Sequence, residues 1–207
     1  PMVLGHEGAG IVEALGAGVD DLAEGDHVVF VFVPSCGNCG PCLAGRPALC
    51  EPGFAANSAG TMLGGGHRLH SGGSPLFHQV GVSCFAEYAV SARCSLIKVE
   101  PELPLEEAAL FSCAVITGVG AVVNTAKVPA GSTVAVVGLG GTGLAVLLGA
   151  RSVGARRVIG IDVLDFKTAL GRQLGADATF DANDEGVIDQ IREVTQGGVD
   201  FAFECVG

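Results

Sequence analysis

Hydrophobic positions follow two different patterns in the two halves of the chain. From about Thr117 onward, apolar runs alternate with helix-like stretches, which is typical of buried parallel strands joined by helices. Strands are expected at 132–137, 157–161, 178–180 and 200–204, and helices from the glycine-rich turn to about 154, at 166–174 and at 185–194. This βαβαβαβ order predicts an α/β domain containing part of a doubly wound parallel sheet.

Before that point the apolar runs are shorter and are interrupted by glycine. Short strands are expected at 11–13 and 25–30, and small antiparallel strands with glycine turns are expected from Gly64 to Val90.

One uncharged stretch in the second half of the chain, 128–150, has the length of a membrane span. Its several glycines and its change from a strand-like to a helix-like run indicate a buried strand, turn and helix instead.

Composition and charge narrow the possible partners and settings. The chain has 207 residues, a formal net charge of −11 and no basic run, which disfavours binding to nucleic-acid phosphates. Eight cysteines without a visible signal peptide favour a reducing, cytoplasmic setting and no membrane partner. Because the chain starts at Pro1 and ends at Gly207 directly after an apolar run, we expect both ends to be cuts through a longer protein.

Four cysteines with gaps of two, two and seven residues form the first candidate site: Cys36, Cys39, Cys42 and Cys50. This spacing suits one tetrahedral Zn²⁺ held by four thiolates, and the glycines and the proline between them allow the tight turns. The absence of secretory features speaks against disulfides, and the wide last gap speaks against an iron–sulfur cluster. Four protein ligands would fill the coordination of the ion, so we expect this zinc to be structural.

A glycine-rich loop follows the first long apolar run and forms the second candidate site: Gly138, Leu139, Gly140, Gly141, Thr142 and Gly143. A strand precedes it, a helix follows it, and Asp162 ends the next strand, 24 residues after Gly138. This context indicates a dinucleotide site in which the glycines allow the turn, the approach of the pyrophosphate and the packing of the helix. Asp162 is expected to bind the ribose hydroxyls and to repel a 2′-phosphate, which favours NAD over NADP.

A third set of candidate ligands is scattered. His6 and Glu7 precede the first expected strand, and Cys113 lies among small apolar residues. These residues do not complete a catalytic zinc site, which usually has three protein ligands and one open position. Cys84 and Cys94 are possible further ligands, but their strand-like surroundings favour buried small hydrophobes. The other histidines are expected to be structural or at the surface: His27, His67, His70 and His78.

Together these motifs resemble the zinc-dependent alcohol dehydrogenases of the medium-chain dehydrogenase/reductase superfamily. The resemblance covers the whole chain and is nearest to the class III branch, which contains glutathione-dependent formaldehyde dehydrogenase, and to its bacterial relatives. The segments that carry it are 5–10, the four-cysteine lobe at 34–52, 118–124, 138–143 and 198–200. It implies a GroES-like β-rich catalytic domain over 1–115, N-terminally truncated, and a Rossmann NAD-binding domain over 116–207, C-terminally truncated.

The resemblance also implies roles for single residues. His6 and Cys113 would be two of three protein ligands of a catalytic zinc, with Glu7 as the neighbouring acid. The third ligand, a cysteine, would lie about twenty residues before His6 and outside the chain, so the chain alone is expected to be inactive. Three further residues would lie at the adenosine ribose, the nicotinamide and the substrate pocket respectively: Lys167, Thr117 and Phe32.

Two departures from the family pattern bear on the substrate and the metal. Class III enzymes have an arginine soon after the fourth lobe cysteine that anchors the glutathione carboxylate, and positions 51–63 contain none. The glycines that usually flank the second zinc cysteine are Ser112 and Ala114 here. We expect ligation to survive this change because both residues are small.

The implied activity is NAD-linked hydride transfer that interconverts a small alcohol and an aldehyde or ketone, with one structural and one catalytic Zn²⁺. The whole protein is expected to be a homodimer or a homotetramer. Two alternatives remain: a zinc-free quinone or enoyl reductase of the same superfamily, and a non-catalytic scaffold. His6, Cys113 and the four-cysteine lobe speak against the first, whereas the second stays open because the third ligand lies outside the chain.

Overall fold

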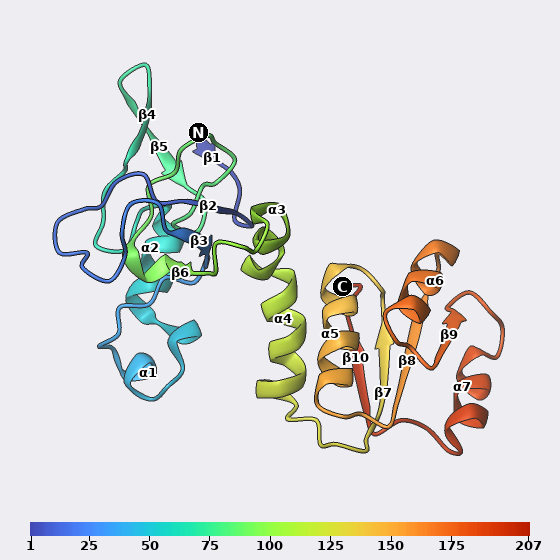
Figure 1. Cartoon of the computed structure of the whole chain (residues 1–207). Helices are drawn as coiled ribbons and strands as arrows, with labels where there is room; N and C mark the ends of the chain where they lie inside the picture. Colours follow the sequence, from blue (N-terminus) through green and yellow to red (C-terminus); the bar gives the residue numbers. More distant parts are fainter. The chain divides into compact units, whose positions relative to one another are not determined.

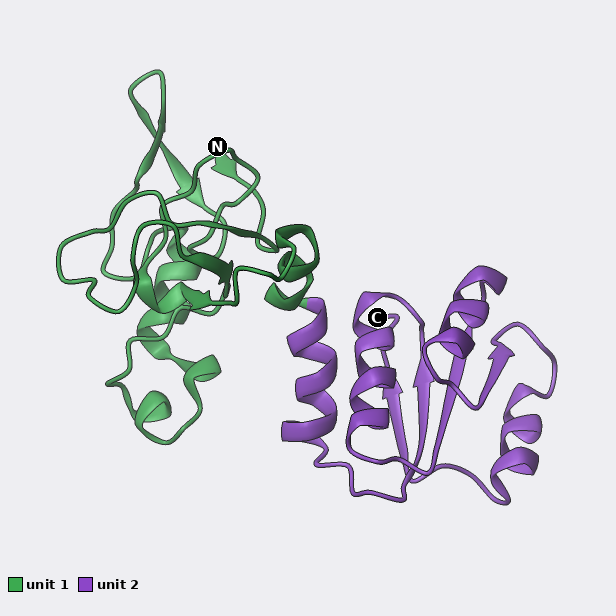
Figure 2. Cartoon of the chain, viewed as in Figure 1, with its two compact units in different colours: residues 1–113 green, residues 114–207 purple.

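Short strands, short helices and loops make up the chain as far as Cys113, and longer parallel strands alternate with helices after it. The computed structural model describes residues 1–207 and divides there into two units, Pro1–Cys113 (unit 1) and Ala114–Gly207 (unit 2; Figure 2). The division lies two residues before the boundary suggested by the sequence.

Unit 1 contains two small sheets of three strands each (Figure 1). The antiparallel sheet has the order β2-β3-β6, with β2 at Ala9–Ile11, β3 at His27–Phe30 and β6 at Leu96–Lys98. The second sheet has the order β1-β5-β4, with β1 at Met2–Val3, β5 at Ser74–His78 and β4 at Leu69–Ser71. In this sheet β1 runs parallel to β5, whereas β4 pairs with β5 as an antiparallel hairpin.

The expectation of antiparallel strands throughout 64–90 is therefore only partly right. After His78 the chain forms loops, because Val80 and Ser83 both have a positive φ, at 45° and 53°, which no regular strand accommodates. The Ser83 hydroxyl stabilises this bend by accepting from the Gln79 N–H at 2.8 Å and donating to the Val3 carbonyl at 2.7 Å.

The helical segments of unit 1 are short: α1 (Gly40–Leu43), η1 (Pro47–Leu49), α2 (Glu51–Ala59), η2 (Arg93–Ser95), α3 (Leu105–Ala108) and η3 (Ala109–Ser112). In α2, the longest, the Cys50 sulfur caps the N-terminus by accepting the Gly53 N–H. The helix ends at Gly60, whose φ of 64° is a left-handed conformation that glycine adopts without strain.

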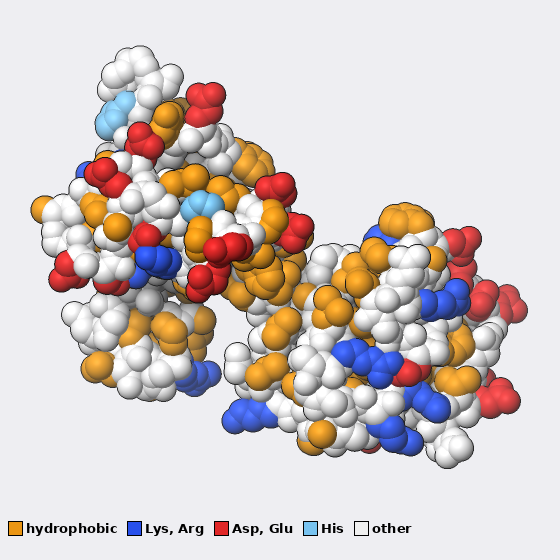
Figure 3. Space-filling view, viewed as in Figure 1, with side chains coloured by type: hydrophobic (Ala, Val, Ile, Leu, Met, Phe, Trp, Pro, Cys, Tyr) orange, Lys and Arg blue, Asp and Glu red, His pale blue; other side chains and the backbone are white.

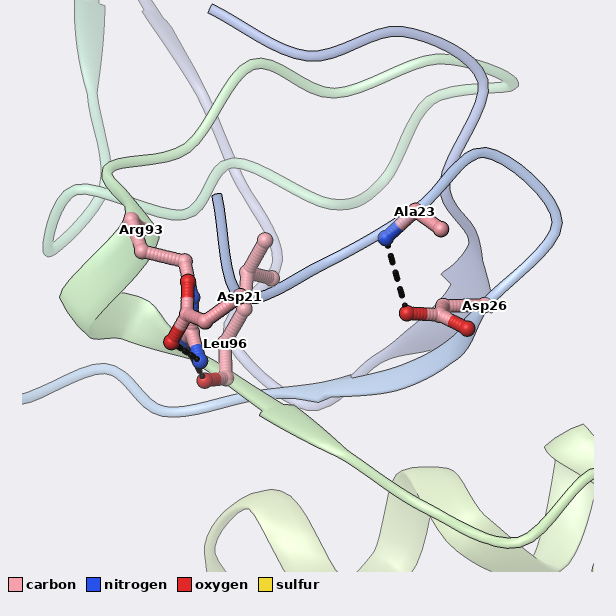
Figure 4. A network of polar contacts seen from close by, with 5 residues as sticks. All are labelled: Asp21, Ala23, Asp26, Arg93 and Leu96. Atoms are coloured by element: carbon pink, nitrogen blue, oxygen red, sulfur yellow. Dashed lines mark hydrogen bonds and ion pairs between the residues drawn. The ribbon is translucent and has the colours of Figure 1, made fainter. Parts of the chain in front are cut away.

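A small apolar cluster around Val12, Leu22 and Val28 supports the β2-β3-β6 sheet. At its edge, Arg93 donates to both Asp21 carboxylate oxygens at 2.7 and 2.6 Å and to the Leu96 carbonyl at 2.7 Å (Figure 4). The hydrogen bond from Arg93 keeps the pKa of Asp21 below its usual value. These contacts connect the loop before β3 to Arg93, 72 residues away in the sequence, and through it to the start of β6.

Unit 2 contains one parallel sheet of four strands in the order β10-β7-β8-β9. The strands are β7 (Thr133–Val137), β8 (Arg157–Asp162), β9 (Ala178–Asp181) and β10 (Phe201–Glu204). The predicted strands are confirmed to within one residue at each end. Because β10 lies on the other side of β7 from β8, the chain reverses its winding between β7 and β10, where doubly wound folds bind ligands.

The helices of unit 2 are α4 (Ala114–Gly120), which continues into a π-helical turn (Ala121–Thr125), α5 (Gly141–Ser152), α6 (Asp165–Gln173) and α7 (Val187–Thr195). Helix α4 packs against α5 (Figure 1), and a Cβ added at Gly118 would lie 2.4 Å from the Thr142 carbonyl oxygen. The core combines β7, β8 and α5 through fully buried residues such as Val134, Leu147 and Val158. The segment 128–150 is therefore a strand, a turn and a helix, as predicted.

No single helix is long and apolar enough to cross a membrane. Two consecutive helical segments with a bend between them, Leu105–Ser112 and Ala114–Thr125, reach the required length and composition only when they are taken together.

Unit 1 has four basic and twelve acidic residues. On the face drawn in Figure 3 its acidic side chains are spread over the surface rather than gathered at one place.

Candidate functional site

The sulfurs of the four clustered cysteines converge in unit 1. The ligand atoms of Cys36, Cys39, Cys42 and Cys50 all lie within 4.8 Å of one another. None of the eight cysteines of the chain forms a disulfide. This is the only place in the structure where three or more His, Cys, Asp or Glu ligand atoms gather closely enough to hold one metal ion. The structure therefore brings together the four thiols that the sequence predicted as ligands of one metal ion.

Backbone N–H groups point at these sulfurs. The Cys50 sulfur accepts from the Cys36 N–H at 3.2 Å and from the Gly53 N–H at 3.3 Å, and the Cys36 sulfur accepts from the Cys39 N–H at 3.3 Å. Gly53 reaches this position only because it has no side chain, since a Cβ there would lie 2.0 Å from the Pro34 carbonyl oxygen. Amide donors of this kind stabilise a thiolate over a thiol.

The acidity of the thiols fits a metal bound by thiolates. A hydrogen bond from the Cys42 backbone, the largest effect, lowers the pKa of the Cys39 thiol to about 7. Burial and the neighbouring Cys39 raise the pKa of the Cys42 thiol to about 11. The Cys39 thiol thus ionises readily, whereas the Cys42 thiol resists ionisation beside it. A divalent cation bound between them would offset the repulsion between the two thiolates. The donor set, four sulfurs without an open position, fits structural Zn²⁺.

The segment that carries His6 and Glu7 is held in place by the strained loop after β5. The Cys84 N–H donates to the Gly5 carbonyl at 3.1 Å, the Phe85 N–H donates to the Leu4 carbonyl at 3.0 Å, and the Gly5 N–H donates to the Gln79 side chain. Gly5 is buried, and a Cβ there would lie 2.4 Å from the Phe85 nitrogen. His6 is half-buried and Glu7 is exposed next to this anchored turn.

Ser112 connects the same segment to Cys113. Its hydroxyl donates to the Gly8 carbonyl at 2.9 Å and accepts from the Gly8 N–H at 3.2 Å, across 104 residues of sequence. Cys113 follows Ser112 directly, and Gly8 lies two residues after His6. The half-buried Cys113 is thus tied to the segment of His6 through its neighbour, although these residues do not form a three-ligand metal group.

The immediate surroundings of His6 are aromatic and sulfur-containing. The ring of Phe32 meets the His6 ring edge-on at 5.4 Å between centroids. Burial raises the pKa of the Cys84 thiol, and the charge of Glu7 adds to that shift. Cys84 lies in a loop rather than a strand, and Cys94 is exposed in η2, so the expectation that both are buried in strands was wrong. The positive φ of Ser83, 53°, bends the chain directly before Cys84.

The glycine-rich loop of unit 2 combines one crowded position with one open position. A Cβ added at Gly143 would lie 1.8 Å from the Gly138 carbonyl oxygen, whereas a Cβ added at Gly140 would meet no atom within 4 Å. Gly138 has a φ of 89°, which turns the chain out of β7. Helix α5 begins after Gly140 with no side chain capping its N-terminus. This open, positively polarised helix end fits a pyrophosphate.

Asp162 is buried at the end of β8, and the loop depends on it. Its carboxylate accepts from the Leu139 N–H at 2.7 Å and from the Leu164 N–H at 3.1 Å, and the Lys167 ammonium lies 3.6 Å away. Burial raises the pKa of Asp162, but these two amides and Lys167 outweigh it, so the net shift is downward. The acid therefore stays ionised, although only 5% of its side-chain surface is exposed.

The remaining predicted cofactor residues differ in exposure. Leu139 places its side chain in the core, with 1% of its surface exposed, so only its backbone belongs to the loop surface. Thr117 is exposed on α4, and Thr142 is half-buried in the first turn of α5. The anchoring roles of Ser112, Gln79 and Ser83 leave no signal in the sequence, because single serines and glutamines give no pattern that reveals partners about 75 to 105 residues away.

Two protein families match the chain. Residues 1–101 match the family described as alcohol dehydrogenase GroES-like domain, and residues 141–207 match the family described as zinc-binding dehydrogenase. The two matches lie on either side of the boundary between the two units.

Curated relatives and solved structures agree with these matches. The class-3 alcohol dehydrogenase of Drosophila melanogaster is 46% identical over 211 residues, which cover 100% of this chain and 56% of the relative. The S-(hydroxymethyl)glutathione dehydrogenase of Photobacterium damsela subsp. piscicida is 44% identical, with 100% of this chain and 57% of the relative covered. The chain thus spans little more than half the length of the curated relatives it matches.

Among solved structures, an alcohol dehydrogenase zinc-binding domain protein from Burkholderia ambifaria matches with a TM-score of 0.93 and 42% identity. Benzyl alcohol dehydrogenase from Acinetobacter calcoaceticus matches with a TM-score of 0.91 and 38% identity. Each match covers 100% of this chain and 56% of the other.

The crowded and open glycines of the loop predict different effects of the same substitution. Gly143→Ala is expected to cost about 3 kcal/mol or more of stability, because its Cβ collides with the Gly138 carbonyl and neither backbone can yield freely. Gly140→Ala is expected to cost less than about 1 kcal/mol, since its Cβ meets open space. Thermal unfolding of the two variants tests this, and equal destabilisation would contradict the proposed packing.

The four-thiol cluster predicts the loss of one metal ion when a single thiol is removed. Cys39→Ser is expected to lose one zinc per chain by elemental analysis and about 4 kcal/mol or more of stability, because the remaining ligands no longer close the site. Cys94→Ser is the matched control, since Cys94 is exposed in the same unit and lies outside the cluster. A Cys39→Ser protein with unchanged zinc content and melting would refute the assignment.

Proposed function

Because this chain belongs to the zinc-dependent alcohol dehydrogenases of the medium-chain dehydrogenase/reductase superfamily, nearest the class III branch, we propose that the whole protein is an NAD-linked alcohol dehydrogenase. It would interconvert an alcohol and an aldehyde or ketone by hydride transfer. The observation that carries this proposal is the pair of Ser112 hydrogen bonds that fixes Cys113 against the segment of His6.

Two zinc ions are part of the proposal. The four-cysteine lobe would hold a structural ion, and its amide-supported sulfurs fit that role. His6 and Cys113 would contribute to a catalytic site, with Glu7 beside it as the neighbouring acid. Zinc bound there would supply Lewis acidity that lowers the pKa of an alcohol hydroxyl. An imidazole and a thiolate are suitable zinc donors, and the anchored Leu4–Gly8 segment would hold them in register.

The residues of unit 2 would orient the dinucleotide. The space beside Gly140 and the uncapped start of α5 would receive the pyrophosphate, and Asp162 would accept hydrogen bonds from the adenosine ribose. Lys167, 3.6 Å from the Asp162 carboxylate, would contribute a donor at the same ribose. Thr117 would lie near the nicotinamide, as the family resemblance implies. The ionised state of Asp162 supports NAD rather than NADP as the cofactor.

The substrate would be an uncharged alcohol rather than an anionic glutathione adduct. The segment after the fourth lobe cysteine, 51–63, contains no arginine or lysine, and α2 instead begins with Glu51. Unit 1 also carries an excess of acidic residues, which disfavours an anionic substrate. Phe32, in contact with the His6 ring, would present an apolar wall to the substrate.

We further propose that the whole protein is cytoplasmic and forms a homodimer or a homotetramer, in keeping with the family.

The role of Asp162 predicts a change in cofactor preference. In the whole protein, Asp162→Arg is expected to raise the NADP-to-NAD ratio of kcat/KM by about tenfold or more, because the repulsion of the 2′-phosphate is removed. Asp177→Asn is the matched control, since Asp177 accepts from the Val158 N–H at 2.6 Å and pairs with Arg151. Its loss would lower stability without changing cofactor preference. An unchanged ratio in Asp162→Arg would exclude the ribose role.

The proposed activity predicts NADH formation from uncharged alcohols. The whole protein is expected to reduce NAD with primary aliphatic alcohols or benzyl alcohol and to show at least about tenfold lower kcat/KM with S-(hydroxymethyl)glutathione. Elemental analysis of the same preparation is expected to give two zinc ions per chain. Turnover of a quinone or an enone without bound zinc would support a zinc-free reductase, and the absence of turnover with every class would support a scaffold.

A further inference from the structure

Ser112 is completely buried, yet its hydroxyl is fully used. It is the last residue of η3, and none of its surface is exposed. The hydroxyl contacts both backbone groups of one residue, donating to the Gly8 carbonyl at 2.9 Å and accepting from the Gly8 N–H at 3.2 Å. A hydroxyl has one proton to donate, and that proton is directed at Gly8 rather than at the helix that carries it.

Gly8 is held on its other sides as well. Its carbonyl also accepts the Phe30 N–H from β3 at 3.0 Å. A Cβ added at Gly8 would lie 2.8 Å from the Cys84 sulfur and 3.2 Å from the Phe30 ring. Gly8 therefore has a single position, fixed by β3, by the loop after β5 and by Ser112. The hydroxyl is the only one of these contacts that leads directly to Cys113.

From this arrangement we propose that Ser112 is a positioning residue, which fixes the separation of His6 and Cys113 before a metal ion binds. The inference rests on the proposed function, because it concerns the catalytic zinc assigned to these two residues. Cys113 is the direct neighbour of Ser112, and His6 is two residues before Gly8. A rigid link this close to both donors lowers the cost of bringing them together at one ion.

The test removes the hydroxyl and measures metal binding rather than turnover. In the whole protein, stripped of its exchangeable ion by a chelator, Ser112→Ala is expected to bind Co²⁺ about tenfold to a hundredfold more weakly than the wild type. As long as the four-cysteine lobe keeps its zinc, which elemental analysis checks, the thiolate-to-cobalt absorption band reports this site. Amide hydrogen exchange at Gly8 is expected to accelerate in the same variant, because its N–H loses its acceptor.

Ser95→Ala provides a matched control. Ser95 is equally buried in unit 1, but its hydroxyl has no hydrogen-bond partner. Its removal is expected to leave cobalt affinity, the absorption band and Gly8 exchange at wild-type values. Ser112→Thr keeps a hydroxyl and is expected to restore most of the affinity if the added methyl group is accommodated. Should that variant not fold, the comparison of Ser112→Ala with Ser95→Ala still decides the question.

Three results would overturn the inference. Cobalt affinity within twofold of the wild type in Ser112→Ala would show that the hydroxyl does not position the ligands. An equal loss in Ser95→Ala, or a loss accompanied by release of the zinc in the four-cysteine lobe, would indicate a general effect on unit 1. If the wild type itself holds only the ion of that lobe, the proposed function fails together with the inference. Two ions in the wild type with unchanged affinity in Ser112→Ala would overturn the inference alone.

Discussion

Backbone segments in this chain approach one another too closely for a Cβ atom, and each candidate site lies at such an approach. Gly53 packs on the Pro34 carbonyl in the four-cysteine lobe, Gly5 packs on Phe85 beside His6, and Gly143 packs on Gly138 in the glycine-rich loop. An added Cβ would lie 2.4 Å or less from a backbone atom in all three cases. Contacts between main chains cannot relax by a change of rotamer, so they fix geometry more firmly than side-chain packing does.

These close backbone contacts also account for the hydrogen-bond donors that stabilise negative charge at the candidate sites. Bringing main chain close to main chain directs N–H groups at acceptors: the Cys50 sulfur receives two amides, and so does the Asp162 carboxylate. Such donors need no lysine or arginine and cost little reorganisation, because the fold already holds them. They stabilise a thiolate over a thiol and a carboxylate over a carboxylic acid. An acidic protein with few cations can thereby still present ionised ligands.

The sequence predicted most of unit 2 and less of unit 1, and the difference has a physical cause. In unit 2 the strands β7 and β8 are buried on both faces and all four strands alternate with helices, so hydrophobic runs reveal them, and the glycine loop and Asp162 follow from the motif. In unit 1 the strands are short, β1 pairs in parallel with β5, and the loop after β5 bends at Val80 and Ser83. No periodicity signals a β-branched residue with a positive φ, because tertiary contacts impose that conformation.

The four-cysteine lobe and the segment of His6 differ in the same way, and this sets the order in which they can form. The four cysteines lie within 15 residues, so closing that loop costs little entropy and the lobe can gather its thiols early. The segment of His6 depends on contacts across 74, 80 and 104 residues, through Gln79, Ser83 and Ser112. Such contacts form only once most of unit 1 is folded. A motif that is readable from the sequence is therefore one that assembles locally. The segment of His6 is defined by distant partners, and this is why the contacts of Ser112 are revealed only by the structure.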